Sequence, residues 1–81
     1  MMDVSSISDI VNLWPDRATL AADLRELGHS EVQAGRVHKW AENCSIPSRY
    51  QHALLQAARA RGFQLTADRL VELHAALRTA A

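Results

Sequence analysis

Apolar residues recur along this chain at spacings of three and four, which is the period of an α-helix. Proline, glycine and short polar residues interrupt this pattern and divide it into five expected helices. No run of alternating β-branched residues occurs, and no Asn-Gly or Asp-Gly pair marks a hairpin turn. The pattern therefore predicts an all-α fold, a compact bundle of four to five helices in a single domain over residues 1–81, with an ordered core at about 6–77.

Residues with strong positional preferences mark where these helices begin and end. Serine, threonine and aspartate cap helix starts, proline is pre-organised for a first turn, and glycine adopts the left-handed conformation at helix ends. In chain order the boundary residues are Ser5 or Ser6 (cap), Pro15 (stop), Asp16 (cap), Gly28 (end), Pro47 (start), Gly62 (end) and Thr66 (cap). Between Gly28 and the third helix, expected at about 34–43, the pattern is loose and indicates a loop.

One face of each helix is expected to build the core. The residues expected to point inward are Ile7, Ile10, Val11, Trp14, Ala18, Leu20, Ala21, Leu24, Leu27, Val37, Trp40, Ala41, Tyr50, Leu54, Ala57, Ala58, either Ala60 or Arg61, Leu70, Leu73, His74 and Leu77. Both tryptophans stand at helical spacing with aliphatic residues, so we expect them in the core rather than stacked on a base. The leucine stripe of the last helix either completes this core or forms a dimer seam.

Length and composition argue against an enzyme. A chain of 81 residues has a small core, and its many alanines favour close helix packing over a roomy cavity. It contains no nucleophile paired with a base and no glycine-rich phosphate loop. Its four histidines are scattered and lack the spacing of a metal site. We therefore expect no catalytic activity, no metal and no cofactor.

The compartment is expected to be the cytoplasm. Cys44 is the single cysteine, which excludes an internal disulfide and fits a reducing environment. The first residues lack the basic and apolar regions of a signal peptide. No apolar run approaches the roughly 18–20 residues that span a bilayer, so no membrane association is expected.

Charge is unevenly distributed although the net charge is zero. Residues 1–31 carry six acidic and two basic side chains, a net charge of −4, whereas residues 32–61 carry five basic and one acidic, a net charge of +4. This sorting presents a positive face to a polyanion while keeping the chain neutral. The alternative is that ordinary solvated helix faces happen to be sorted in this way.

The helix expected at about 34–43 combines an apolar face with an array of hydrogen-bond donors. Val37 and Trp40 anchor one face, and Ile46-Pro47 leads into the next helix. A DNA-reading helix needs both features, because the anchored face aims the outward side chains at base edges and phosphates. The residues expected to contact DNA are Gln33, Arg36, His38, Lys39 and Asn43, with Ser48 and Arg49 as a phosphate seat at the start of the following helix. For His38, a merely solvated position is an equal alternative.

Three short motifs carry a resemblance to a known family. They are Leu20-Ala21-Ala22-Asp23-Leu24, Val37-His38-Lys39-Trp40 and Ser45-Ile46-Pro47-Ser48-Arg49-Tyr50, preceded by Trp14-Pro15-Asp16-Arg17. Over residues 7–75 this layout resembles the small phage-type helix-turn-helix regulators of the Cro/repressor-like superfamily, and more narrowly a short bacterial group with a V-x-x-W and S-I-P-x-x-Y layout. The resemblance implies that the third helix enters the major groove, usually from a symmetric dimer.

One spacing departs from that family. Leu24 and Val37 are thirteen positions apart, more than a short helix-turn-helix turn requires. Either the second helix runs to Leu27 and the turn is enlarged over residues 28–33, or Leu27-Gly28 takes the usual Leu-Gly place in a shifted register. Arg36 and Lys39 remain on the reading face in both alternatives, whereas Gln33 does not.

The sequence thus favours sequence-specific binding of double-stranded DNA by a transcriptional regulator of phage or phage-derived type. We expect a homodimer on an operator, associated with the nucleoid when bound. The alternative is a helical protein-interaction module, an adaptor or anti-repressor that binds another transcription protein. Neutral net charge and the acidic first third favour this alternative.

Overall fold

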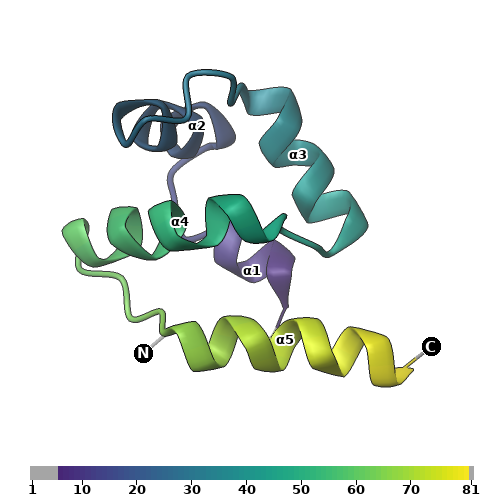
Figure 1. Ribbon diagram of the computed structural model, residues 1–81. Coiled ribbons are helices and arrows are strands. Elements are labelled where there is room, and N and C mark those ends of the chain that lie inside the picture. Colours follow the sequence, from purple (N-terminus) through teal and green to yellow (C-terminus); the bar gives the residue numbers. More distant parts are fainter. Residues whose placement is uncertain (1–5, 81) are drawn as a thin grey trace.

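Five helices make up the protein, as a computed structural model shows for residues 6–80, with side chains described through residue 75. The helices are α1 (Ile7–Val11), α2 (Arg17–Glu26), α3 (Ala34–Asn43), α4 (Ser48–Ala60) and α5 (Ala67–Ala80) (Figure 1). No strand occurs in this range, which confirms the predicted all-α class.

The helix starts follow the predicted capping residues. The side-chain oxygen of Ser6 accepts the Asp9 N–H at 3.1 Å, that of Asp16 accepts the Thr19 N–H at 2.7 Å, and that of Thr66 accepts the Arg69 N–H at 3.1 Å. Ser6 is therefore the cap of α1. The alternative cap, Ser5, lies outside the described residues.

The helix ends agree with the prediction at the glycines and differ at α1. Gly28 and Gly62 have φ of +107° and +78°, the left-handed conformation predicted for them. The first helix ends at Val11, before Pro15, and the chain continues in tighter turns in which the Leu13 and Trp14 N–H groups donate to the Ile10 and Val11 carbonyls. Pro47 occupies the cap position just before α4 rather than its first turn.

Most of the predicted inward residues are buried in one core. Those confirmed are Ile7, Ile10, Val11, Trp14, Leu20, Ala21, Leu24, Val37, Trp40, Tyr50, Leu54, Ala57, Ala58 and Leu70. Ala41, Leu73 and His74 are half-buried, and the side chain of Leu77 lies outside those described. Ala18, Leu27, Ala60 and Arg61 are exposed, which corrects the prediction.

Leu27 is exposed because α2 ends one residue earlier. As the residue that caps α2, its backbone has left the helical path, and 42% of its surface is exposed. Val32, farther along the connection to α3, is fully buried instead. A one-residue change in a helix end thus moves a leucine from the expected core position to the surface.

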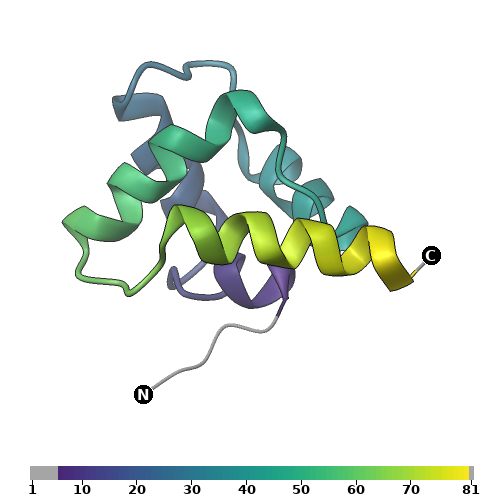
Figure 2. The ribbon, with the colours of Figure 1, turned by 60° about the horizontal axis from the view of Figure 1, so that its bottom comes forward.

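The helices surround this core in a simple arrangement. Helix α3 packs on α1 and α2, α4 packs on α2, and α5 packs on α1. Figure 1 shows α4 between the α2–α3 pair and α5, and Figure 2 shows α5 crossing in front of α1. In this arrangement the polar residues of α3, which are Arg36, His38, Lys39, Glu42 and Asn43, all stay exposed.

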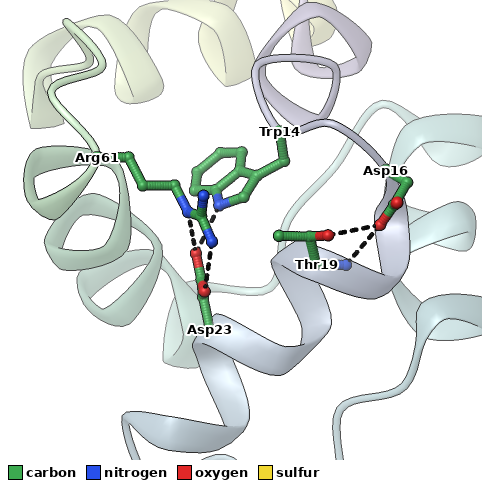
Figure 3. Close-up of polar contacts among 5 residues, drawn as sticks. All are labelled: Trp14, Asp16, Thr19, Asp23 and Arg61. Atoms are coloured by element: carbon green, nitrogen blue, oxygen red, sulfur yellow. Dashed lines mark hydrogen bonds and ion pairs between the residues drawn. The ribbon is translucent and has the colours of Figure 1, made fainter.

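A carboxylate on α2 ties three parts of the chain together (Figure 3). The Trp14 indole N–H donates to Asp23 Oδ2 at 2.8 Å, and the Arg61 guanidinium donates to the two Asp23 carboxylate oxygens at 2.6 and 3.0 Å. Asp23 therefore joins the turn after α1 to the end of α4. It also satisfies the polar end of Trp14, whose ring packs edge-on against Phe63 at 5.1 Å.

These hydrogen bonds predict a loss of stability in acid. Donation by Arg61, and to a smaller extent by Trp14, holds the pKa of the Asp23 carboxyl below its ordinary value. Such a carboxyl stabilises the fold above its unfolded-state pKa, and this stabilisation disappears as the pH falls through the lower, folded-state pKa. Asp23→Asn is expected to lower the free energy of unfolding by about 1 kcal/mol at pH 7. Below about pH 4, the free energy of unfolding should fall less steeply with pH in this variant than in the wild type.

Urea unfolding between pH 2 and pH 7 measures this effect. The matched control is Glu26→Gln, which alters an exposed acid one turn farther along α2. The control should unfold as the wild type does at each pH. Equal effects of the two substitutions would show that Asp23 contributes only general surface charge.

Candidate nucleic-acid interface

Helix α3 has one face locked into the core. Val37 is fully buried and Trp40 is 4% exposed, as the spacing of these two residues predicted. The Trp40 ring lies 5.1 Å from the ring of Tyr50, in the first turn of α4. This aromatic pair sets the position of α3 relative to the start of α4.

The exposed surface of α3 carries the residues that the sequence predicts for DNA contact. Gln33, Arg36, His38, Lys39 and Asn43 are all exposed. Arg36, Lys39 and Asn43 follow spacings of three and four, so they share one face of the helix. His38 lies on the adjoining face, and Gln33 is the residue just before the helix, at its cap position.

Ser48 and Arg49 are exposed at the beginning of α4, which four linker residues separate from the end of α3. The linker of residues 44–47 brings the start of α4 next to the end of α3. The Arg49 guanidinium lies 4.8 Å from the centre of the Tyr50 ring, a cation–π distance. This contact orients Arg49 and leaves it exposed.

Glu42 is a neighbour that the sequence analysis did not weigh. Its carboxylate lies 3.8 Å from the ring of His38 and 3.8 Å from the Lys39 ammonium. All three side chains are more than half exposed, so these pairs are weak and do not hold the cations against the protein. Within the described residues, the Arg36 side chain forms no hydrogen bond or ion pair.

The connection between α2 and α3 is seven residues long, from 27 to 33. This length matches the enlarged-turn alternative, with α2 ending at Glu26 rather than Leu27. It exceeds the three or four residues that join the helices of an ordinary helix-turn-helix. Buried Val32 anchors the connection, and Arg25 donates to the Val32 carbonyl at 2.8 Å.

A polar cluster clamps this connection onto α4. The Tyr50 hydroxyl donates to the Glu31 carboxylate at 2.7 Å, and the His29 ring packs edge-on against the Tyr50 ring at 5.0 Å. The tyrosine hydrogen bond is the main reason that the pKa of Glu31 lies below its ordinary value. Nothing in the sequence indicated this cluster, because Tyr50 and Glu31 are nineteen positions apart.

The end of α3 holds a strained residue. Cys44 caps the helix with φ of 53° and ψ of 41°, the left-handed region that non-glycine residues occupy at a cost of about 1–2 kcal/mol. Glycine adopts this conformation without strain, but it has more conformational entropy in the unfolded state, which offsets part of the gain. Cys44→Gly is therefore expected to raise the free energy of unfolding by up to about 1 kcal/mol.

Thermal and urea unfolding measure this gain in stability. Cys44→Val serves as a control that is expected to have the opposite effect. Valine is disfavoured at positive φ and should lower the melting temperature. A Gly variant less stable than the wild type would mean that the packing of the half-buried Cys44 side chain outweighs its backbone strain.

Two surface hollows lie outside the exposed face of α3, and Ser48 lines the second of them. One, of about 320 Å³, lies between α2 and α4 and is lined by Asp23, Glu26, Leu27, Gln56, Ala57, Ala60 and Arg61. The other, of about 370 Å³, lies between α5 and the linker that follows α3. In the range searched, no three histidine, cysteine or acidic side chains gather closely enough to hold a metal ion. None of the helices, as far as they are described, is long and apolar enough to cross a membrane.

Comparison with known proteins adds no relative. No protein-family model, no curated protein and no solved structure matches this chain.

Proposed function

We propose that the protein binds double-stranded DNA through α3 and acts as a sequence-specific transcriptional regulator of the phage-type helix-turn-helix kind, without catalytic activity. The observation that carries the proposal is the division of α3 into two faces. Val37 and Trp40 are buried, whereas Arg36 and Lys39 are exposed.

The exposed groups suit the chemistry of a major groove. Arginine and lysine donate to guanine O6 and N7, and glutamine and asparagine pair with adenine. In this proposal Arg36, Lys39 and His38 read base edges, Asn43 reaches a base or the backbone, and Gln33 contacts DNA at the start of the helix. Ser48 and Arg49, together with the free N–H groups at the start of α4, bind a phosphate.

A symmetric dimer is part of the proposal. A single small module buries limited DNA surface, and two copies one helical turn apart double the contacts and read a two-fold site. Regulation then follows from occlusion or recruitment at an operator in the cytoplasm.

Selection of DNA fragments by the purified protein tests this proposal. We expect enrichment of inverted repeats, because a two-fold reader selects a two-fold site. The logarithm of affinity for the selected duplex should fall with the logarithm of salt concentration with a slope of roughly −3 per protomer, as three or four phosphates are neutralised. Fragments without a shared sequence, or an affinity independent of salt, would contradict sequence-specific DNA binding.

A second candidate is a protein-interaction module, an adaptor or anti-repressor that binds another regulator. Two observations favour it: the net charge is zero, and the α2–α3 connection is longer than that of an ordinary helix-turn-helix. Recovery of a transcription protein in a pull-down, with no retardation of genomic DNA fragments at low salt, would select this candidate.

A further inference from the structure

The linker between α3 and α4 is held by side chains from two other parts of the molecule. Ile46, at its centre, is buried. Its N–H donates to Nε2 of His74 on α5 at 3.1 Å, and its carbonyl accepts the Gln51 side-chain amide of α4 at 2.8 Å. Both backbone polar groups of Ile46 are therefore satisfied by side chains, as buried groups require.

The two contacts of the His74 ring define its protonation. Nδ1 lies 2.8 Å from the Leu70 carbonyl oxygen, which only accepts, so Nδ1 must carry a hydrogen. Nε2 receives the N–H of Ile46, so Nε2 must be without a hydrogen. The arrangement therefore requires a neutral ring in a single tautomer, because a protonated histidine has donors at both nitrogens.

We propose that His74 is a positioning residue for the DNA-binding surface, and that its protonation releases the linker that sets the start of α4 relative to α3. This inference rests on the proposed DNA-binding function. Ile46 lies three residues after Asn43 and two before Ser48, so a shift of Ile46 moves the proposed phosphate seat relative to the reading helix.

The charged side chains of the neighbouring helices lie outside the groove that His74 lines. The groove that it lines is open and measures about 370 Å³, and its other lining residues are not ionisable: Ser45, Ile46, Pro47, Ser48, Gln51, Val71 and Ala75. On α1, which packs against α5, the one ionisable residue is Asp9. The linker carries Cys44, and the start of α4, which supplies Ser48 and Gln51 to the groove, carries Arg49, Tyr50 and His52. On α5 itself Arg69 lies 3.9 Å from Glu72, Asp68 is in the first turn, and the side chain of Arg78 lies outside those described.

Protonation converts the Ile46 contact from attraction to repulsion. Two N–H groups then face each other where one donated to the other, and the hydrogen bond is lost. Histidine gains its proton as the pH falls from about 8 to about 5. A single hydrogen bond of ordinary strength corresponds to about a fivefold change in the equilibrium that it supports.

Nuclear magnetic resonance of the free, ¹⁵N-labelled protein tests the contact without DNA. Between pH 8 and pH 5 the Ile46 amide signal should shift with the same midpoint as the ring signals of His74. In His74→Gln this shift should disappear, because the glutamine side-chain oxygen accepts the Ile46 N–H and does not titrate. An Ile46 amide that ignores pH, or one that still titrates in His74→Gln, would overturn the proposal.

A second arm measures affinity for the selected DNA duplex at each pH. The quantity compared is the ratio of the affinity of the wild type to that of His74→Gln, and this ratio should fall about fivefold from pH 8 to pH 5. His52→Gln, which removes an exposed histidine of α4, is the matched control and should follow the wild type. A constant ratio for His74→Gln would overturn the positioning role. Absence of any DNA binding would instead contradict the proposed function, while the resonance titration still decides the Ile46 contact.

Discussion

Arg36→Glu and Lys39→Glu should each weaken binding to the selected duplex by at least about 100-fold. Each change removes a donor worth about 1–3 kcal/mol of base discrimination and places a carboxylate against the DNA. Both side chains are exposed, and neither supports the core, so the fold should be unchanged. Fluorescence anisotropy of a labelled duplex measures the affinity, and circular dichroism reports the helix content.

The matched control for these variants is Arg59→Glu. Arg59 is also exposed, but it lies near the far end of α4, away from the proposed reading face. It should change the affinity by no more than about threefold, through net charge alone. Full affinity in both α3 variants would show that the interface is elsewhere on the molecule.

Trp40→Ala should remove most of the stability of the domain and bring it close to unfolding at room temperature. Removing a buried tryptophan costs about 3–5 kcal/mol, and a chain of this size has about 5 kcal/mol of total stability. Trp40 also contacts Tyr50, which clamps the α2–α3 connection through Glu31, so its loss loosens both neighbours of the reading helix. Far-ultraviolet circular dichroism and urea unfolding measure the change.

Two further substitutions, one at Trp40 itself and one at the preceding residue, serve as controls. Trp40→Phe retains an aromatic ring and should fold, with a lower melting temperature. Lys39→Ala, in the preceding exposed position, should unfold at the same urea concentration as the wild type. A folded Trp40→Ala protein with near wild-type stability would contradict the view that Trp40 anchors α3.

The sequence predicted the helices and the two faces of α3 because both depend on short-range chemistry. Ser6, Asp16 and Thr66 cap their helices through hydrogen bonds to residues three positions away. Val37 and Trp40 are buried because helical period places them together. Such features require no knowledge of the rest of the fold.

The features that sequence reasoning missed depend on residues far apart in the chain. The pairs Asp23–Arg61 and Ile46–His74 are 38 and 28 positions apart, and no periodic pattern connects them. Leu27 was placed in the core because it continues the apolar stripe of α2. The helix ends before Leu27, and Val32 fills the core from the connection instead.

The most direct measurement of the central claim is a titration of the ¹⁵N-labelled protein with the selected DNA duplex, followed by nuclear magnetic resonance. We predict that the largest amide shifts fall on residues 33–43 and on Ser48 and Arg49, with small shifts over the outer surface of α5. Shifts concentrated on α5 or on the hollow between α2 and α4, or no shifts at low salt, would contradict the claim that α3 is a DNA-reading helix.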